Sequence, residues 1–287
     1  MSNLGNPYNL KLTTFMSILT KDTITKEILP HLTSGNKGPK LSDNKLVGIV
    51  QLILHRLKTG TQWRELPIKQ YMDETYSWQS VFHHFNNWCK KGCWQKALEA
   101  LVIGNKKHLD LSSIQIDGTH TPAKRGGEAV AYQGRKSCKT TNMLCISDKN
   151  GVLIGGSQPE AGNHNDLYDI EKHFCEIIQM LENVGINTDG LFLNADAGFD
   201  SVNLRELCFR YGIIPNFCLN KRNGNISDRD DYFDDLLYKE RTVIEHSFAW
   251  LDAFKALLVR YEKTSRNWFN LNLIGFMSIF LRKLTPK

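Results

Sequence analysis

Hydrophobic and polar residues follow a helical pattern through the first part of the chain. The stretch "LSDNKLVGIVQLILHRLKTG" has apolar residues at helical spacing, with Ser42 as a capping residue and Gly60 as a stop. The stretch "TYSWQSVFHHFNNWCKKGCWQKALEALV" continues the helical period, with an interruption at Gly92. The pattern predicts a small helical domain over residues 41–111, after an N-terminal segment, residues 1–40, that ends in the loop sequence "TSGNKGPK".

After this helical part, short apolar runs alternate with helical segments. The stretch "SSIQID" alternates as a half-buried strand does, and the following Gly118 predicts that this strand ends at Asp117. Two more apolar runs, "MLCISDKN" and "GVLIGGS", meet at Asn150-Gly151, which is a strong hairpin signal. A helix in "NDLYDIEKHFCEIIQMLENVG", a strand in "GLFLNADAGFD", a helix in "SVNLRELCFRYG" and a strand in "IIPNFCL" follow. The pattern then predicts one long final helix in "DDLLYKERTVIEHSFAWLDAFKALLVRYEK".

This order of elements predicts an α/β domain with a mixed five-stranded ribonuclease H-like sheet over residues 112–287. The first and fourth strands of such a sheet are central neighbours, so Asp117 and Asp196 would emerge side by side. Two close carboxylates repel each other unless a cation lies between them, and oxygen ligands suit Mg²⁺ or Mn²⁺. The alternative for Asp117 is a structural role, because an isolated Asp-Gly pair is typical of a turn.

A third carboxylate comes from the predicted final helix. At roughly 100° per residue, Tyr238, Arg241 and Glu245 fall within one sector of about 60°, together with Asp252. The adjacent apolar stripe contains Ile244, Phe248, Leu251 and Leu258. Glu245 would therefore lie beside the buried face, from which it can reach the sheet; a solvated surface glutamate is the alternative.

The composition is that of a folded globular protein, since 41% of the 287 residues are hydrophobic and 10% are aromatic. The 7 cysteines form an odd set without a CxxC pair or zinc-ligand spacing, which favours reduced thiols in a cytosolic protein. The first residues, "MSNLGNPYNLKLTTF", lack the pattern of a signal peptide, and "LNLIGFMSIFL" is too short to span a bilayer. We therefore expect neither secretion nor membrane insertion.

The net charge of +6 is concentrated in the first part of the chain. Residues 1–111 carry 15 Lys/Arg and 8 Asp/Glu, a balance of +7, whereas residues 112–287 carry 21 and 22, a balance of −1. Such asymmetry favours contact with a polyanion, although a solvated basic face produces the same charge run. The helical domain is consistent with a helix-turn-helix-like DNA-binding module. The alternative is a plain helical domain whose core contains Trp63, Trp78, Trp88 and Trp94.

Four blocks of the sequence, in the right order, resemble those of bacterial insertion-sequence transposases of the DDE class. Tyr238, Arg241 and Glu245 match the Tyr-x₂-Arg-x₃-Glu signature of that class. The stretches "IQIDGTHTP" and "NADAGFDS" resemble the blocks that carry its two aspartates. The stretches "TGTQWRELP" and "YSWQSVFHHFNNWCKKGCW" resemble the N-terminal block of insertion sequence family five, which is related to family four. The resemblance covers residues 41 to 285, approximately.

The resemblance implies a DNA transposase that binds the terminal inverted repeats of its own insertion sequence and catalyses metal-dependent strand cleavage and strand transfer. It implies that Asp117, Asp196 and Glu245 are the catalytic residues and hold two divalent ions, Mg²⁺ or Mn²⁺. The implied partners are the double-stranded DNA of the transposon ends and of the target, and a second copy of the chain in a synaptic homodimer. The implied location is the bacterial cytoplasm, in association with the nucleoid and without a membrane contact.

Further residues are implied to contact DNA. Tyr238 and Arg241 would hold the terminal phosphates, Arg241 through a bidentate fork. In related families the signature continues from the Glu through six residues to a Lys, but residue 252 is Asp here, and Lys255 is the candidate to replace that contact. The basic loop offers candidates for sequence-independent contacts with the DNA backbone, namely Lys124, Arg125, Arg135, Lys136 and Lys139.

Two other functions stay open at this point. One is a catalytically inactive, DNA-binding transposase remnant, which Asp252 favours and the three carboxylates oppose; the other is a nuclease of the same fold that only hydrolyses. Near the predicted site, we expect His120 to lie outside the metal ligands. His164 and Asp166 could supply a further ligand, but we expect Asn165 or Asp166 to cap the following helix.

Overall fold

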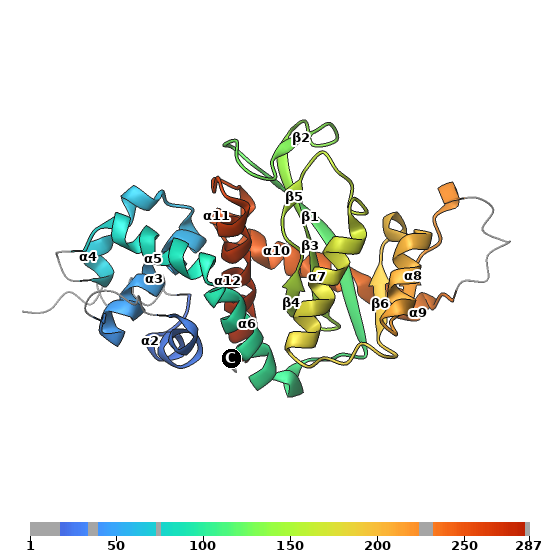
Figure 1. Ribbon diagram of the computed structural model, residues 1–287, viewed down its shortest axis with the longest axis horizontal. Coiled ribbons are helices and arrows are strands. Elements are labelled where there is room, and N and C mark those ends of the chain that lie inside the picture. The colour runs from blue at the N-terminus through green and yellow to red at the C-terminus, as the bar shows by residue number, and fades with distance from the viewer. Residues whose placement is uncertain (1–17, 34–39, 73–75, 224–231, 285–287) are drawn as a thin grey trace, which may run out of the picture. The chain divides into compact units, whose positions relative to one another are not determined.

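The computed structural model describes residues 18–33, 40–72, 76–223 and 232–284. Most of the loop predicted in "TSGNKGPK" and the first part of the N-terminal segment lie outside these residues. The chain forms two compact units, Met1–Ala97 and Leu98–Lys287, whose elements are labelled in Figure 1.

The first unit is helical. Its elements are α2 (Lys21–Thr23), η1 (Ile24–Ile28), η2 (Leu29–His31), α3 (Asp43–Thr59), η3 (Trp63–Glu65), α4 (Ile68–Tyr71) and α5 (Trp78–Lys90), and α6 (Cys93–Gly104) runs on into the second unit. Helix α3 follows Ser42 and ends at Gly60, whose φ of 69° is typical of a glycine C-cap. Gly92, with a φ of 66°, separates α5 from α6. The sequence pattern predicted all three of these positions.

The tryptophans of the first unit divide into two groups. Trp88 and Trp94 are buried, with ring centroids 5.8 Å apart in an edge-to-face arrangement, and the indole N–H of Trp88 donates to the Thr33 carbonyl at 3.1 Å. Trp63 and Trp78 are only partly buried. Of the four tryptophans that the plain helical alternative places in the core, two are therefore core residues and two are not.

The second unit is built on a mixed sheet. Its strands are β1 (Ser113–Pro122), β2 (Ala131–Gln133), β3 (Cys138–Asp148), β4 (Leu153–Gly156), β5 (Glu160–Ala161), β6 (Phe192–Ala195) and β7 (Ile214–Phe217). Strands β4-β3-β1-β6-β7 lie in this order, with β1 antiparallel to β3 and parallel to β6, and β6 parallel to β7. This is the ribonuclease H-like order, so the predicted fold class is confirmed. Two short strands, β2 and β5, add to the five that the sequence predicted by also pairing with β3.

Helices cover the sheet. They are α7 (Ile170–Asn183), α8 (Val202–Arg210), α9 (Asp235–Tyr238), η8 (Lys239–Thr242), α10 (Val243–Asp252), α11 (Lys255–Leu258) and α12 (Ser265–Leu284). In the view of Figure 1, α7 lies in front of the strands and α10 behind them. Met180 of α7 packs over Gly155 of β4, and the Ser247 hydroxyl of α10 donates to the Gly151 carbonyl at 2.8 Å. The predicted hairpin turn at Asn150-Gly151 thus lies under α10.

The first strand is longer than the sequence pattern indicated. β1 does not end at Asp117 but continues to Pro122, because it stays paired with β3 from Ile114 to Pro122. Its parallel pairing with β6 ends earlier, at Gln115. The prediction of a strand end at Asp117 was therefore wrong on the β3 side, whereas on the β6 side Asp117 lies beyond the last paired residue.

The prediction of one long final helix was also wrong. The segment breaks into α9, the 3₁₀ turn η8, α10 and α11, with an extended residue at Phe254 that interrupts the helical period. Because of this break, Leu258 is exposed and Leu257 is buried in place of the predicted stripe residue. Ile244 and Leu251, which precede the break, are buried as the stripe predicted.

The last helix, α12, was not predicted from the pattern of polar and apolar positions. Residues Asn267 to Leu281 are all buried, so its apolar and polar residues show no single exposed face. Among the described residues, no helix combines the length and the apolar character that crossing a membrane requires.

Candidate active site

A ladder of buried side-chain amides crosses the three parallel strands. Gln115, Asn194 and Asn216 lie in register on β1, β6 and β7, and none is exposed to solvent. The Asn216 amide donates to Asn194 at 2.8 Å, and the Asn194 amide donates to Gln115 at 2.8 Å. A buried amide without a hydrogen-bond partner destabilises the folded state. A shift of one strand would break these hydrogen bonds, so the ladder favours the observed register of the three strands.

The two predicted aspartates follow from that register. Side chains two residues apart on a strand lie on the same face. Asp117 is two residues after Gln115, and Asp196 is two residues after Asn194. The two carboxylates therefore form the next step of the ladder, just beyond the point where the pairing between β1 and β6 ends. The sequence prediction that the two would be side by side depends on this parallel pairing.

The ionised form of Asp117 is disfavoured in the folded protein. Burial raises its pKa to about 7, and the nearby carboxylates of Asp196 and Asp166 act in the same direction. The Gly118 N–H donates to Asp117 Oδ1 at 2.8 Å and Arg241 attracts it, but these two effects only partly oppose the shift. A bound cation would stabilise the ionised form of this carboxyl group.

Asp196 lies where β6 gives way to the short 3₁₀ turn η5 (Ala197–Phe199). Its Oδ1 accepts a hydrogen bond from the Gly198 N–H at 2.7 Å, which fixes the side chain at the end of the strand. The other oxygen, Oδ2, accepts no hydrogen bond from the described residues.

Asp166 contacts the first strand and does not cap α7, contrary to the sequence prediction. Helix α7 begins at Ile170, with Asp169 at the N-cap position in a left-handed conformation (φ 49°). Asp166 Oδ1 accepts from the Asn142 amide at 2.7 Å and lies 3.5 Å from His120 Nε2. Burial opposes ionisation, but these two hydrogen bonds hold the pKa of Asp166 below its ordinary value.

Gly118 makes this arrangement possible. A Cβ at Gly118 would collide with Asp166 Oδ1, so only glycine admits the carboxylate against the backbone of β1. Asp166 therefore lies near Asp117 because of its tertiary contact with Gly118. Helix-capping preferences do not predict such a contact.

The amide ladder also holds the segment that carries the Tyr-x₂-Arg-x₃-Glu signature. The Asn194 amide donates to the Leu237 carbonyl, and the Asn216 amide to the Asp234 carbonyl, both at 3.1 Å. At the other end of the ladder, the Ser113 hydroxyl donates to Glu240 at 3.0 Å. The signal for these residues was a polar amide inside each of three predicted strands, and the sequence analysis missed it.

The three signature residues are arranged around one guanidinium. Arg241 lies over the Tyr238 ring, 5.7 Å from its centroid, and donates to Glu245 Oε1 at 3.0 Å. Burial lowers the pKa of Arg241, but the charges of Tyr238, Glu245 and Asp117 outweigh this effect and raise the pKa above its ordinary value. The structure thus brings Asp117 and Asp196 together and places Arg241, the partner of Glu245, near Asp117, while the Glu245 side chain remains 54% exposed.

The donor chemistry at this site suits a hard divalent cation, although a complete ligand set is not assembled. Among the described residues, no three His, Cys, Asp or Glu side chains lie close enough together to hold a metal ion. Asp117 and Asp196 offer carboxylate oxygens, which fit Mg²⁺ or Mn²⁺. The third predicted ligand, Glu245, accepts a hydrogen bond from Arg241 instead.

The predicted DNA-contacting lysines and arginines are exposed in the second unit, namely Lys124, Arg125, Arg135, Lys136, Lys139 and Lys255. Lys136 donates to the His120 carbonyl at 2.6 Å. Burial raises the pKa of Asp252, and Lys136 and Lys255 oppose this shift, so both cations lie near the residue that departs from the signature.

Two family models match the sequence. The model described as "Transposase DDE domain" matches residues 109–281. The model described as "Putative transposase of IS4/5 family" matches residues 23–98. None of the curated protein sequences matches the chain.

The similarity to solved structures is weak. A piggyBac transposase synaptic complex with hairpin DNA is 12% identical, covers 99% of this chain and 83% of its own, and has a TM-score of 0.43. A pre-cleavage Mos1 transpososome is 11% identical, covers 89% of this chain and 82% of its own, and has a TM-score of 0.28. The fold assignment rests on the strand order instead.

Proposed function

The chain belongs to the DDE transposase family, and from this we propose that it binds the terminal inverted repeats of its own insertion sequence and catalyses metal-dependent strand cleavage and strand transfer. The observation that carries the proposal is the unbalanced charge of Asp117 beside Asp196, at the end of the parallel pairing between two central strands. A carboxylate pair of this kind is suited to metal-dependent phosphoryl transfer.

Asp117, Asp196 and Glu245 would hold two divalent ions, Mg²⁺ or Mn²⁺. When bound, such ions activate the attacking oxygen and stabilise the leaving oxygen of an in-line displacement. The protein's own residues would orient the DNA: Arg241 and Tyr238 would hold a phosphate near the scissile bond, with the guanidinium as a two-pronged donor.

The contact between Arg241 and Glu245 gives this proposal a specific form. Arg241 donates to Glu245 at 3.0 Å in the protein alone. A DNA phosphate that binds Arg241 would compete with Glu245 for the same guanidinium, and the released carboxylate could then turn toward Asp117 and Asp196. DNA binding and completion of the metal site would therefore be coupled.

The remaining contacts would be made over a wider surface. The exposed basic residues of the second unit would neutralise backbone phosphates without reading sequence, and the basic helical unit would bind the terminal repeat. Joining the two ends of one element would require at least two copies of the chain, so we include a homodimer in the proposal.

The test is cleavage and strand transfer on DNA that carries the ends flanking the gene, in Mg²⁺ and in Mn²⁺. Wild type should nick at the repeat boundary and join the product to target DNA. Asp117→Asn, Asp196→Asn and Glu245→Gln should bind the same DNA and not cut it. The matched control is Asp235→Asn, which removes an exposed carboxylate three residues before Tyr238 and should cut normally.

The other outcomes identify the alternatives. Cleavage without a joined product would identify a nuclease that only hydrolyses. Binding without cleavage by wild type in either metal would identify an inactive DNA-binding remnant, and the proposed catalysis would be wrong for this chain.

A further inference from the structure

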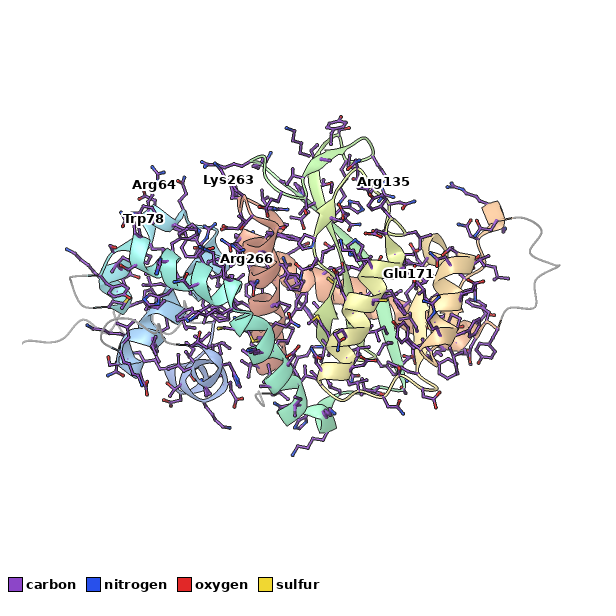
Figure 2. All side chains as sticks on the ribbon, in the orientation of Figure 1. Arg64, Trp78, Arg135, Glu171, Lys263 and Arg266 are labelled. Carbon is purple, nitrogen blue, oxygen red and sulfur yellow. The ribbon has the colours of Figure 1, made fainter. Side chains whose placement is uncertain are left out.

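A cavity of about 850 Å³ lies next to the carboxylates of the second unit. Its wall is formed by the loop before α7, the turn between β6 and α8, the segment that follows β7, and Arg135, which is labelled in Figure 2. This volume is within the range of ligand-binding pockets. The function proposed above assigns only Arg135, among the residues of this wall, to DNA.

The cavity adjoins the proposed catalytic residues. One lining residue, Gly198, donates its backbone N–H to Asp196 at 2.7 Å. Another, Asp166, lies against Gly118, the residue that follows Asp117. A DNA strand whose scissile phosphate lay at Asp117 and Asp196 would have to continue past this opening.

The acidic residues in the wall are already paired within the protein. Asp200 accepts hydrogen bonds from the Arg205 guanidinium at 2.9 Å and from the Asn220 backbone N–H at 2.7 Å. Asp166 is held by Asn142 and His120. The Arg205 guanidinium balances the charge of Asp200, and hydrogen bonds stabilise the charge of Asp166.

The wall also contains two exposed guanidinium groups. Arg135 lies close enough to Asp166 to help lower the pKa of that carboxyl group, and Arg222 forms no ion pair with the described residues. Amide side chains of Asn165 and Asn220 and the hydroxyl of Ser201 at the start of α8 supply further polar groups to the same wall. Guanidinium, amide and hydroxyl groups are those that usually contact DNA phosphates.

The wall favours the backbone of DNA over its bases. Sites that receive an unstacked base commonly stack it on an aromatic side chain. The described lining of this cavity contains no aromatic residue. Its chemistry therefore fits phosphates and sugars.

We propose that this cavity holds the sugar–phosphate backbone of the DNA strand on one side of the scissile phosphate, with Arg135 and Arg222 each contacting one phosphate. The inference rests on the proposed function, because the strand reaches the cavity from the carboxylate pair. It adds a defined anchoring site to that function.

The test is the salt dependence of DNA binding, measured by fluorescence anisotropy with the element's own end duplex in EDTA, so that no cleavage occurs. Each phosphate contact contributes about 0.9 to the slope of log Kobs against log salt concentration. Arg135→Gln and Arg222→Gln should each lower the slope by about 0.9, and the double variant by about 1.8. Arg210→Gln is the matched control, since Arg210 is exposed, pairs with Glu171 and is not part of the wall.

A second measurement locates the contacts. Single methylphosphonate substitutions, which remove the charge of one phosphate, are introduced along both strands near the repeat boundary. Wild type should lose affinity at two phosphates on one strand next to the cleavage position, and the double variant should show no further loss at those two positions.

The outcomes separate this inference from the proposed function. If wild type cuts the ends but the double variant keeps the wild-type slope and the wild-type methylphosphonate pattern, the cavity is not a backbone site and the proposed function stands. If wild type binds with the expected slopes but never cuts, the anchoring site stands and the proposed catalysis fails. If wild type does not bind the duplex at all, both are wrong.

Discussion

Asp117 and Asp200 are aspartates of the same unit, and both are withdrawn from solvent, but their surroundings are opposite. Asp200, whose side chain is 0% exposed, accepts from the Arg205 guanidinium at 2.9 Å and from a backbone N–H at 2.7 Å. Asp117 accepts one backbone N–H and lies near two further carboxylates. One charge is balanced within the protein, and the other is not.

This difference separates a structural carboxylate from a functional one. A buried charge is tolerated when a partner and hydrogen bonds compensate for its desolvation. Arg205 of α8 forms such a pair with Asp200 of the turn that precedes this helix, and it also donates to the Phe217 carbonyl at the end of β7. Asp117 lacks that compensation, so its position is a cost to stability that a bound cation would relieve.

The largest effect on stability is expected from Asp200→Asn. The substitution leaves the Arg205 guanidinium buried without its counter-charge, and breaking a buried pair in this way costs about 3–5 kcal/mol. Urea unfolding monitored by circular dichroism measures the loss. The double variant Asp200→Asn, Arg205→Met removes both charges and should be less destabilised than the sum of the single variants; an additive result would show that the pair is not coupled.

The opposite sign is expected from Asp117→Asn. This variant removes a charge that burial disfavours, so the metal-free protein at pH 8 should unfold with a free energy roughly 2–4 kcal/mol higher than wild type, while cleavage is lost. The measurement is urea unfolding in EDTA, run in parallel with the cleavage assay. A variant less stable than wild type would show that Asp117 is balanced in the fold as Asp200 is.

The pH dependence of the same variant makes the comparison sharper. In the folded protein, Asp117 keeps its proton up to about pH 7, whereas in the unfolded chain it loses the proton near the ordinary value of 3.8. Between these values the folded state binds more protons, so this group's contribution to stability is full below pH 4, approximately, and is lost as the pH rises through 7. The decline should be present in wild type and reduced in Asp117→Asn.

A smaller effect is expected from Asn194→Ala, in the ladder that precedes the carboxylates. The change removes one hydrogen bond from Gln115 and one from Asn216 inside the sheet and releases the Leu237 carbonyl, at a cost of about 1–3 kcal/mol. It should also lower kcat for cleavage with little change in KM for DNA, because the signature segment loses its anchor to β6. Restored kcat in Asn194→Gln would support positioning, whereas a loss of stability with kcat unchanged would leave the ladder a purely structural feature.

The sequence predicted the elements that local chemistry determines. Asn150-Gly151 and Gly60 sit at the turn and the helix end that their backbone preferences require. The predicted end of β1 was wrong, because the strand is extended by its pairing with β3. That pairing joins residues distant in the chain, so the local pattern of polar and apolar residues does not predict it. The role of Asp166 was mistaken for the same reason, since Gly118 and Asn142 are its tertiary neighbours.

The predicted site shows the same division. The neighbouring positions of Asp117 and Asp196 followed from strand order alone, because parallel register sets them. The pairing of Glu245 with Arg241 did not follow, because it depends on how the final segment breaks after the 3₁₀ turn η8. Helical spacing gave the sector of these residues but not their partners.

The smallest effect on stability is expected from Glu245→Gln. Its i,i+4 pair with Arg241 joins η8 to α10 and leaves the Glu245 side chain exposed, and such pairs contribute about 0.3–0.5 kcal/mol. Unfolding free energy should therefore change by less than about 0.5 kcal/mol, while cleavage is abolished. Glu171→Gln is the control, because the Glu171 side chain is 61% exposed and that of Glu245 is 54% exposed; its pair with the more exposed Arg210 should give a similarly small change with full cleavage.

This last variant tests whether Glu245 contributes to cleavage without contributing to stability. Asp117 differs, because its carboxylate is expected to support cleavage and to lower stability. If Glu245→Gln cuts DNA normally, the carboxylate serves only its arginine, and the reacting centre must be built on Asp117 and Asp196 without it. If the variant loses cleavage but binds DNA more tightly, Arg241 has been freed for a phosphate. That result would support the exchange of partners by which DNA completes the metal site.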